Sequence, residues 1–216
     1  MTAANAMKPA PFVISFVNEP MAASVKNLET SLDKYTREEL RLLAQAFEIG
    51  KHDLLLIGDG SGEDYTRPMG WSCIAYDRLR RKAVVHAGSA TVGTNNVAEL
   101  LPYIHALWHF DQEHPNKPPE GYRVAIVSDS ELTVRCGNGK NRRRANGCFW
   151  ASIAWFESQG YVFEWVHVRR NTNHWNRFVD QVAGLFRLAA VELRPEIREA
   201  VENMLPVETF SIAKLS

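Results

Sequence analysis

The chain has 216 residues, 45% of them hydrophobic, and its 25 Lys and Arg residues balance its 25 Asp and Glu residues. This size allows one domain with appendages. The zero net charge excludes a global basic field for nucleic acid, so any such binding must come from local patches. The three cysteines, Cys73, Cys136 and Cys148, form no CxxC pair, and neither a disulfide framework nor a zinc site is indicated.

No apolar run approaches the length of a membrane span, and the N-terminus lacks the order of a signal peptide. We therefore expect a monomeric cytoplasmic protein without membrane contact. Residues 1–50 are predicted to be an extension, irregular at first and then helical from the capping box of Thr36 and Glu39. A protein partner could bind there. We expect the main domain at 51–193 and a C-terminal helix and tail at 194–216.

The main domain is predicted to start with a strand at 53–59. Its apolar run, residues 54–57, is typical of a strand that is buried on both faces. Asp59 is expected at the end of this strand and is followed by Gly60, Ser61 and Gly62. Two further strands are expected at 69–77 and 82–91, joined by a charged hairpin turn.

Helical periodicity begins after Asn95 and Asn96, and Pro102 should bend this helix or delay its start. The pattern then predicts a mixed sheet flanked by helices, an α/β fold. The remaining elements are expected as a strand at 124–127, a short helix at 130–136, a Gly- and Arg-rich loop at 137–147, a helix at 148–158, a strand at 161–168 and a long helix at 174–193.

Four acidic residues occupy comparable positions on these elements. Asp59 and Asp129 each end a buried strand, so their carboxylates emerge side by side if the two strands are parallel neighbours. Glu99 lies in the first turn of the helix after the third strand, and Asp180 lies beside the apolar stripe of the last long helix. Converging carboxylates repel one another, and Mg²⁺ or Mn²⁺ would relieve the conflict. Two such ions about 4 Å apart can activate water for phosphodiester hydrolysis.

Segments 59–61, 94–100, 128–130 and 176–180 resemble, in order, the motifs of type 1 ribonuclease H. The resemblance covers about residues 53–190 and implies the ribonuclease H fold with a five-stranded mixed sheet. It implies that Asp59, Glu99, Asp129 and Asp180 are catalytic ligands of two Mg²⁺ ions, for which Mn²⁺ can substitute. It also implies cleavage of the RNA strand of an RNA/DNA hybrid, which leaves 5′-phosphate and 3′-hydroxyl ends.

The same resemblance suggests residues that bind the substrate. Asn95 and Asn96 would contact the minor groove and the ribose 2′-hydroxyls, the groups that distinguish RNA from DNA. One of the two is also expected to cap its helix. Gly60, Ser61 and Ser130, which adjoin the acids, are further candidates.

The loop before Asp180 departs from the family, which often has a histidine there. Arg170 is in that register, or Arg169 if the loop is one residue longer. His174 could take the histidine's catalytic role in proton transfer or product release. Arg170 and Asn173 instead resemble the Arg-x-x-Asn pattern of branches without the histidine, in which case both would bind substrate. Both alternatives stay open.

A local basic patch follows the fourth strand's helix, where family members often bind the DNA strand. Its residues Lys140, Arg142, Arg143 and Arg144 are predicted to contact phosphates, although a solvated charged loop would have the same composition. The main hypothesis is a metal-dependent endonuclease. The alternatives are a nuclease of this fold that acts on other structured or single-stranded nucleic acid, and a non-catalytic nucleic-acid-binding module, which would have no reason to tolerate four converging acids.

Overall fold

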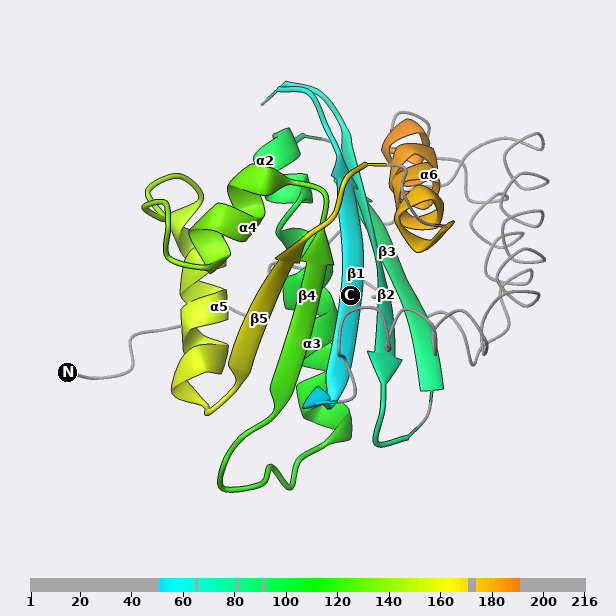
Figure 1. Cartoon of the computed structure of the whole chain (residues 1–216). Helices are drawn as coiled ribbons and strands as arrows, with labels where there is room; N and C mark the ends of the chain where they lie inside the picture. Colours follow the sequence, from blue (N-terminus) through cyan, green and yellow to red (C-terminus); the bar gives the residue numbers. More distant parts are fainter. Residues whose placement is uncertain (1–50, 65, 81, 91, 171–173, 191–216) are drawn as a thin grey trace.

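The computed structural model describes residues 51–190, except 65, 81, 91 and 171–173. Its five strands form one mixed sheet in the order β3-β2-β1-β4-β5 (Figure 1). The predicted N-terminal and C-terminal helices lie outside the described residues. Within the described part, no helix is both long enough and apolar enough to cross a membrane.

The strands match their predicted ranges within two residues. Pairing is antiparallel between β1 and β2 and between β2 and β3, and parallel between β1 and β4 and between β4 and β5. The first and fourth strands are therefore parallel neighbours, which is the condition under which Asp59 and Asp129 were expected to lie side by side. The observed strands are β1 (Leu54–Ser61), β2 (Met69–Asp77), β3 (Lys82–Ala90), β4 (Arg123–Ser128) and β5 (Val162–His167).

Helices cover both faces of the sheet (Figure 1). Helix α6 (His174–Ala189) packs on one face. Helices α3 (Leu101–Glu113), α4 (Glu131–Gly137) and α5 (Gly147–Ser158) contribute to the core on the other. The short helix α2 (Asn95–Ala98) precedes α3. Pro102 lies in the first turn of α3, where its missing N–H is tolerated. The predicted effect of this proline is confirmed, since the helix restarts there.

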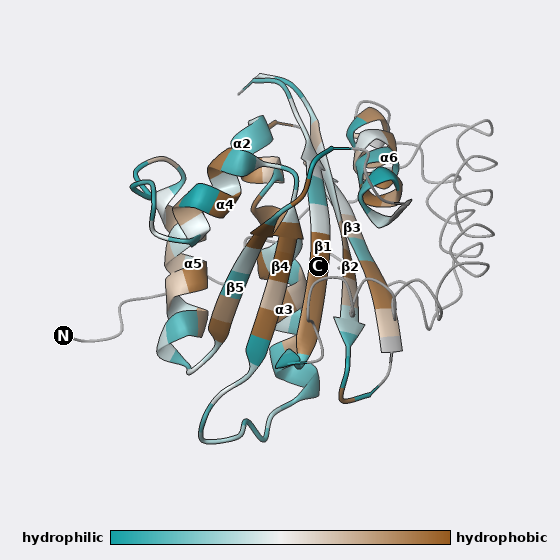
Figure 2. Ribbon diagram, in the orientation of Figure 1, coloured by the Kyte–Doolittle hydropathy of each residue, from teal (hydrophilic) through white to brown (hydrophobic). Residues whose placement is uncertain are grey.

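The first half of strand β1 is hydrophobic (Figure 2). The strand is buried on both faces because its side chains alternate between two cores. Leu55 and Ile57 face the α6 side, whereas Leu54 and Leu56 face the α3 side. The hydroxyl of Tyr103 on α3 lies 2.8 Å from the carbonyl oxygen of Gly58 and 3.0 Å from that of Val127. These contacts link α3 to β1 and β4 close to Asp59 and Asp129.

Candidate metal centre

Three of the four predicted acids converge near the carboxyl-terminal ends of the neighbouring strands β1 and β4. Asp59 lies in β1 and Asp129 directly follows β4, the parallel neighbour of β1. Glu99 is the C-cap residue of α2. One carboxylate oxygen from each residue lies within 4.8 Å of the other two. The predicted convergence is thus observed for these three residues.

Gly60 allows the close approach that brings Glu99 to the strand. A Cβ atom added at Gly60 would lie 2.3 Å from the backbone carbon of Ala98 and 2.5 Å from the backbone nitrogen of Glu99. Real Cβ atoms do not approach backbone so closely, so only glycine permits this contact. Gly60 therefore has a structural role beside the acids, and its predicted contact with substrate stays a prediction.

Three carboxylate oxygens of the cluster are buried without a hydrogen-bond partner among the described residues. The backbone N–H of Gly60 donates to Asp59 Oδ1 at 2.7 Å, and Asn95 Nδ2 lies 3.5 Å from Glu99 Oε1. The other oxygens of these two residues, Asp59 Oδ2 and Glu99 Oε2, have no such donor, and Asp129 Oδ2 has an ion pair with Arg170 but no hydrogen bond. An unsatisfied buried acceptor costs ~1–3 kcal/mol. The donor set, all hard oxygen atoms, fits Mg²⁺ or Mn²⁺.

The acids also disfavour one another's charge. Burial, and next the neighbouring carboxylate of Asp129, raise the pKa of Asp59 to about 8. Burial, Asp59 and Asp129 raise the pKa of Glu99 well above its usual range. At neutral pH without a cation, the cluster therefore retains protons that exposed carboxyls would have lost.

Because the cluster retains protons, the free energy of unfolding should depend on pH when a chelator such as EDTA removes metal ions. The folded chain binds more protons than the unfolded chain between pH ~4, the ordinary pKa of Asp, and pH ~8. The contribution of Asp59 to the free energy of unfolding therefore falls as pH rises through this window. We expect the melting temperature in EDTA to decline more steeply from pH 5 to pH 8 in the wild type than in Asp59→Asn. Equal slopes for the two proteins would contradict the coupling.

The fourth acid, Asp180 on α6, reaches the cluster through Arg170. The guanidinium of Arg170 has Nε 3.2 Å from Asp129 Oδ2, and its Nη2 donates to Asp180 Oδ1 at 3.3 Å. The Arg170 side chain is 61% exposed and that of Asp180 is 39% exposed, so this bridge forms the open rim of the site. His174 begins α6, but its side chain lies outside the described part, as does Asn173.

The sequence contained no signal for this double ion pair, because it joins the loop after β5 to two different elements. The structure shows that Arg170, the residue in register with the family's histidine, pairs with Asp129 and Asp180.

The architecture is similar to solved structures of ribonuclease H1. The N-terminal RNase H domain of a Mycobacterium tuberculosis protein, solved as a fusion with maltose-binding protein, has 20% identity and a TM-score of 0.51, over 65% of this chain and 96% of that chain. LC11-RNase H1, isolated from compost by a metagenomic approach, has 22% identity and a TM-score of 0.52, over 65% of this chain and 99% of that one. Its complex with an RNA/DNA hybrid has 23% identity and a TM-score of 0.53, over 64% of this chain and 99% of that one.

The chain has the ribonuclease H fold. The fold predicted from the sequence motifs is therefore confirmed, including its five-stranded mixed sheet. No protein-family model and no curated protein sequence matches the chain.

The prediction that Asn95 or Asn96 caps helix α2 is wrong. The helix begins at Asn95, and the N-cap is Thr94, whose Oγ1 accepts from the N–H of Val97 at 3.3 Å. The side chain of Asn95 instead accepts from the N–H of Gly62 at 3.2 Å. Asn95 therefore links the glycine-rich end of β1 to the helix that carries Glu99. Asn95 and Asn96 are both exposed.

Ser61 and Ser130 also lie beside the acids. Ser61 ends β1. The Ser130 hydroxyl caps α4 by accepting from the N–H of Thr133 at 3.4 Å. These contacts give Ser130 a structural role, while contact of either serine with substrate stays a prediction.

The basic loop between α4 and α5 divides into an inward arginine and three exposed cations. Arg143 donates to the carbonyl oxygens of Cys136 and Gly137, both at 3.1 Å, pairs with Glu157 at 3.1 Å, and lies over the ring of Trp150. Its guanidinium is thus engaged in holding the loop on α4 and α5. The exposed residues that extend from this loop are Lys140, Arg142 and Arg144.

A second group of potential metal ligands was not predicted from the sequence. His86, His105 and His109 bring ring nitrogens within 4.8 Å of one another. The four-residue spacing of His105 and His109 was the only available signal, because His86 comes from a strand.

Proposed function

We propose that this chain is a metal-dependent endonuclease that hydrolyses the RNA strand of RNA/DNA hybrids. The observation that carries the proposal is the convergence of Asp59, Glu99 and Asp129, with three buried carboxylate oxygens that accept no hydrogen bond among the described residues. The similarity of fold to a ribonuclease H1 solved with an RNA/DNA hybrid supports the class of substrate.

The chemistry follows from the donor set. Asp59, Glu99, Asp129 and Asp180 would hold two Mg²⁺ ions, or Mn²⁺ as substitute. Such ions, when bound, lower the pKa of water and stabilise charge on the leaving oxygen of a phosphodiester. Arg170, at the exposed rim, can hold a phosphate oxygen, since arginine stays protonated at any working pH. The exposed amides of Asn95 and Asn96 can hydrogen-bond ribose 2′-hydroxyls.

The test is cleavage of a strand-labelled RNA/DNA hybrid by the full chain, compared with RNA duplex, DNA duplex and single strands. We expect cleavage of the RNA strand of the hybrid with Mg²⁺ and none in EDTA. Cleavage of only single-stranded or other structured nucleic acid would replace the proposed substrate by the alternative one. Binding of the hybrid without cleavage of any substrate would favour a non-catalytic module.

The basic loop is proposed to bind backbone phosphates through Lys140, Arg142 and Arg144. Replacing these three by Ala, with Arg143 kept to preserve the loop, should weaken hybrid binding and flatten its salt dependence. Each lost phosphate contact should reduce the slope of the logarithm of the binding constant against the logarithm of the salt concentration by about 0.9, the value for duplex DNA. Turnover at saturating substrate should change less than affinity. Binding titrations at several salt concentrations measure the slope.

The matched control for the loop is Arg123→Ala. Arg123 is exposed at the start of β4, the opposite end of the strand from Asp129, so its loss should leave the slope unchanged. An unaltered slope in the triple variant would make the loop a solvated surface feature. Arg143→Ala should instead lower the melting temperature, because it removes the contacts between α4 and α5.

The proposed setting is cytoplasmic, which the three free cysteines support. We further propose that residues 51–193 act as a monomeric catalytic domain and that residues 1–50 are available to a protein partner.

A further inference from the structure

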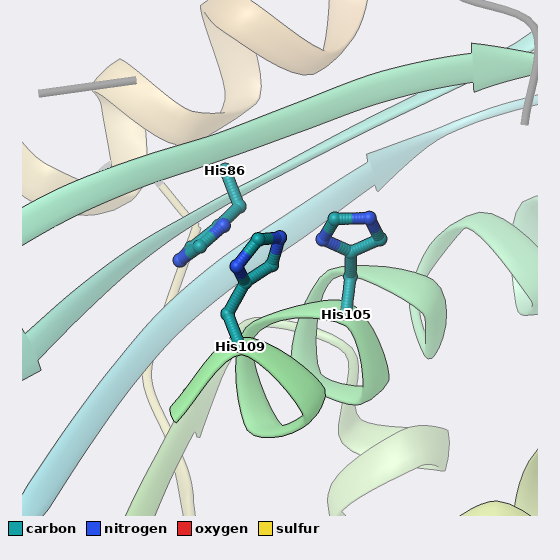
Figure 3. Close-up of side chains that lie close together, drawn as sticks. All are labelled: His86, His105 and His109. Atoms are coloured by element: carbon teal, nitrogen blue, oxygen red, sulfur yellow. The ribbon is translucent and has the colours of Figure 1, made fainter. Parts of the chain in front are cut away.

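Three histidines gather on the face of the sheet covered by α3, on elements other than those that carry the acids. His86 lies on the edge strand β3, and His105 and His109 lie one helical turn apart on α3. Figure 3 shows the three rings facing one another between strand and helix. The ring centroids are 4.9 Å apart for His86 and His109, 5.1 Å for His105 and His109, and 5.8 Å for His86 and His105.

Packing of aromatic rings does not by itself account for this group. His86 is 3% exposed and His105 is 8% exposed. The Nδ1 atom of each is buried without a hydrogen-bond partner among the described residues. A buried polar atom without a partner is unfavourable, and apolar side chains would fill the same space without that cost. The rings of His86 and His105 are therefore better explained as ligands of a shared metal ion.

The chemistry of the group suits a borderline transition metal. Neutral imidazole is a good ligand for Zn²⁺ and a poor one for Mg²⁺. Burial keeps the rings in this neutral form, since it lowers the pKa of His86 and His109 and lowers that of His105 to about 3. Tetrahedral Zn²⁺ bonds of 2.0–2.1 Å separate two nitrogens by ~3.3 Å. The ligand nitrogens, within 4.8 Å of one another, need to close by ~1.5 Å at most.

We propose that His86, His105 and His109 form a zinc-binding site that fastens α3 to the edge strand β3. Three imidazoles leave one tetrahedral position for water. Cys73 lies opposite His86 in the strand register, but its thiol is outside the group of converging ligand atoms, and burial raises its pKa. Glu113 follows His109 by one turn and supplies negative charge near the site. The site is independent of the proposed nuclease function.

The experiment titrates Zn²⁺ into the EDTA-stripped full chain by calorimetry in excess Mg²⁺, followed by metal analysis after desalting. We expect a zinc ion bound per chain at this site and a higher melting temperature with zinc. His109→Gln, at the least buried of the three positions, should weaken zinc binding at least ~100-fold and abolish the rise in melting temperature. Co²⁺ added to the wild type should give the visible bands of a tetrahedral nitrogen site, and these should be lost in His109→Gln.

Two control variants separate this site from other ligands. His52→Gln removes an imidazole outside the group, one that pairs with Glu164 at 2.9 Å, and should bind zinc as the wild type does. Asp59→Asn, which alters the acidic cluster, should also retain this zinc ion. The proposal is overturned if the wild type binds no zinc, if His109→Gln binds zinc with wild-type affinity, or if zinc binding is lost only in Asp59→Asn. Because the cobalt spectrum is recorded on the wild type, the test does not depend on the folding of a variant.

Discussion

Asp59→Asn and Asp129→Asn are each expected to lower the rate of hybrid cleavage by ~10³-fold or more, a loss of the size seen when a principal electrostatic contribution is removed. Asparagine has nearly the same shape as aspartate but carries no charge, so the oxygen cluster loses affinity for Mg²⁺ while the surrounding packing is kept. The initial rate with Mg²⁺ measures the loss, and a circular dichroism spectrum checks the fold.

The same substitutions should raise the melting temperature in EDTA. Asp59 is fully buried and accepts one backbone hydrogen bond, and burial together with Asp129 raises its pKa. Asparagine removes the free-energy cost of either keeping this carboxyl protonated at neutral pH or ionising it beside Asp129. Asp64→Asn is a matched control, because Asp64 is an exposed aspartate shortly after β1 that bonds to Thr66. It should cleave as the wild type does. Wild-type turnover in Asp59→Asn would refute the metal centre.

Arg170→Ala is expected to weaken binding of the hybrid by ~10–100-fold, the range for a hydrogen bond to a charged group, and to change turnover less. Arg170 lies at the rim, where its guanidinium pairs with Asp129 and Asp180. When metal ions hold these acids, the guanidinium can turn to a substrate phosphate. An arginine cannot shuttle protons at working pH, so its loss should appear in KM.

His174→Ala tests the alternative role of the loop. If His174 assists proton transfer or product release, its loss should lower kcat by ~10²-fold or less and leave KM nearly unchanged. We expect the arginine variant to be the more damaging of the two. Steady-state kinetics of both variants on one hybrid decide between them, with Arg169→Ala as the control for loss of a neighbouring arginine. A large fall in kcat for His174→Ala with a normal Arg170→Ala would reverse this expectation.

The sheet and three of its acids could be predicted because each depends on local pattern. The apolar run of β1 predicts a strand buried on both faces. Asp59 follows this run two residues before the end of β1, and Asp129 directly follows the parallel strand β4. The spacing of Glu99 after the third strand positions it at α2. Such local patterns are sufficient to position these acids, since strand burial and chain direction largely determine where the end of a strand lies.

The choice of partner for individual side chains was decided by the tertiary structure. The sequence could not show that Thr94 caps α2 in place of an asparagine, that Arg143 turns inward, or that Arg170 bridges two acids. Nor could it place His86 on the strand facing His105 and His109. Composition and spacing along the chain thus determined the layers and the acid-bearing strand ends. The partners of Arg170 and of His86 were decided only by folding, because they come from segments that are distant in sequence and meet only in the packed structure.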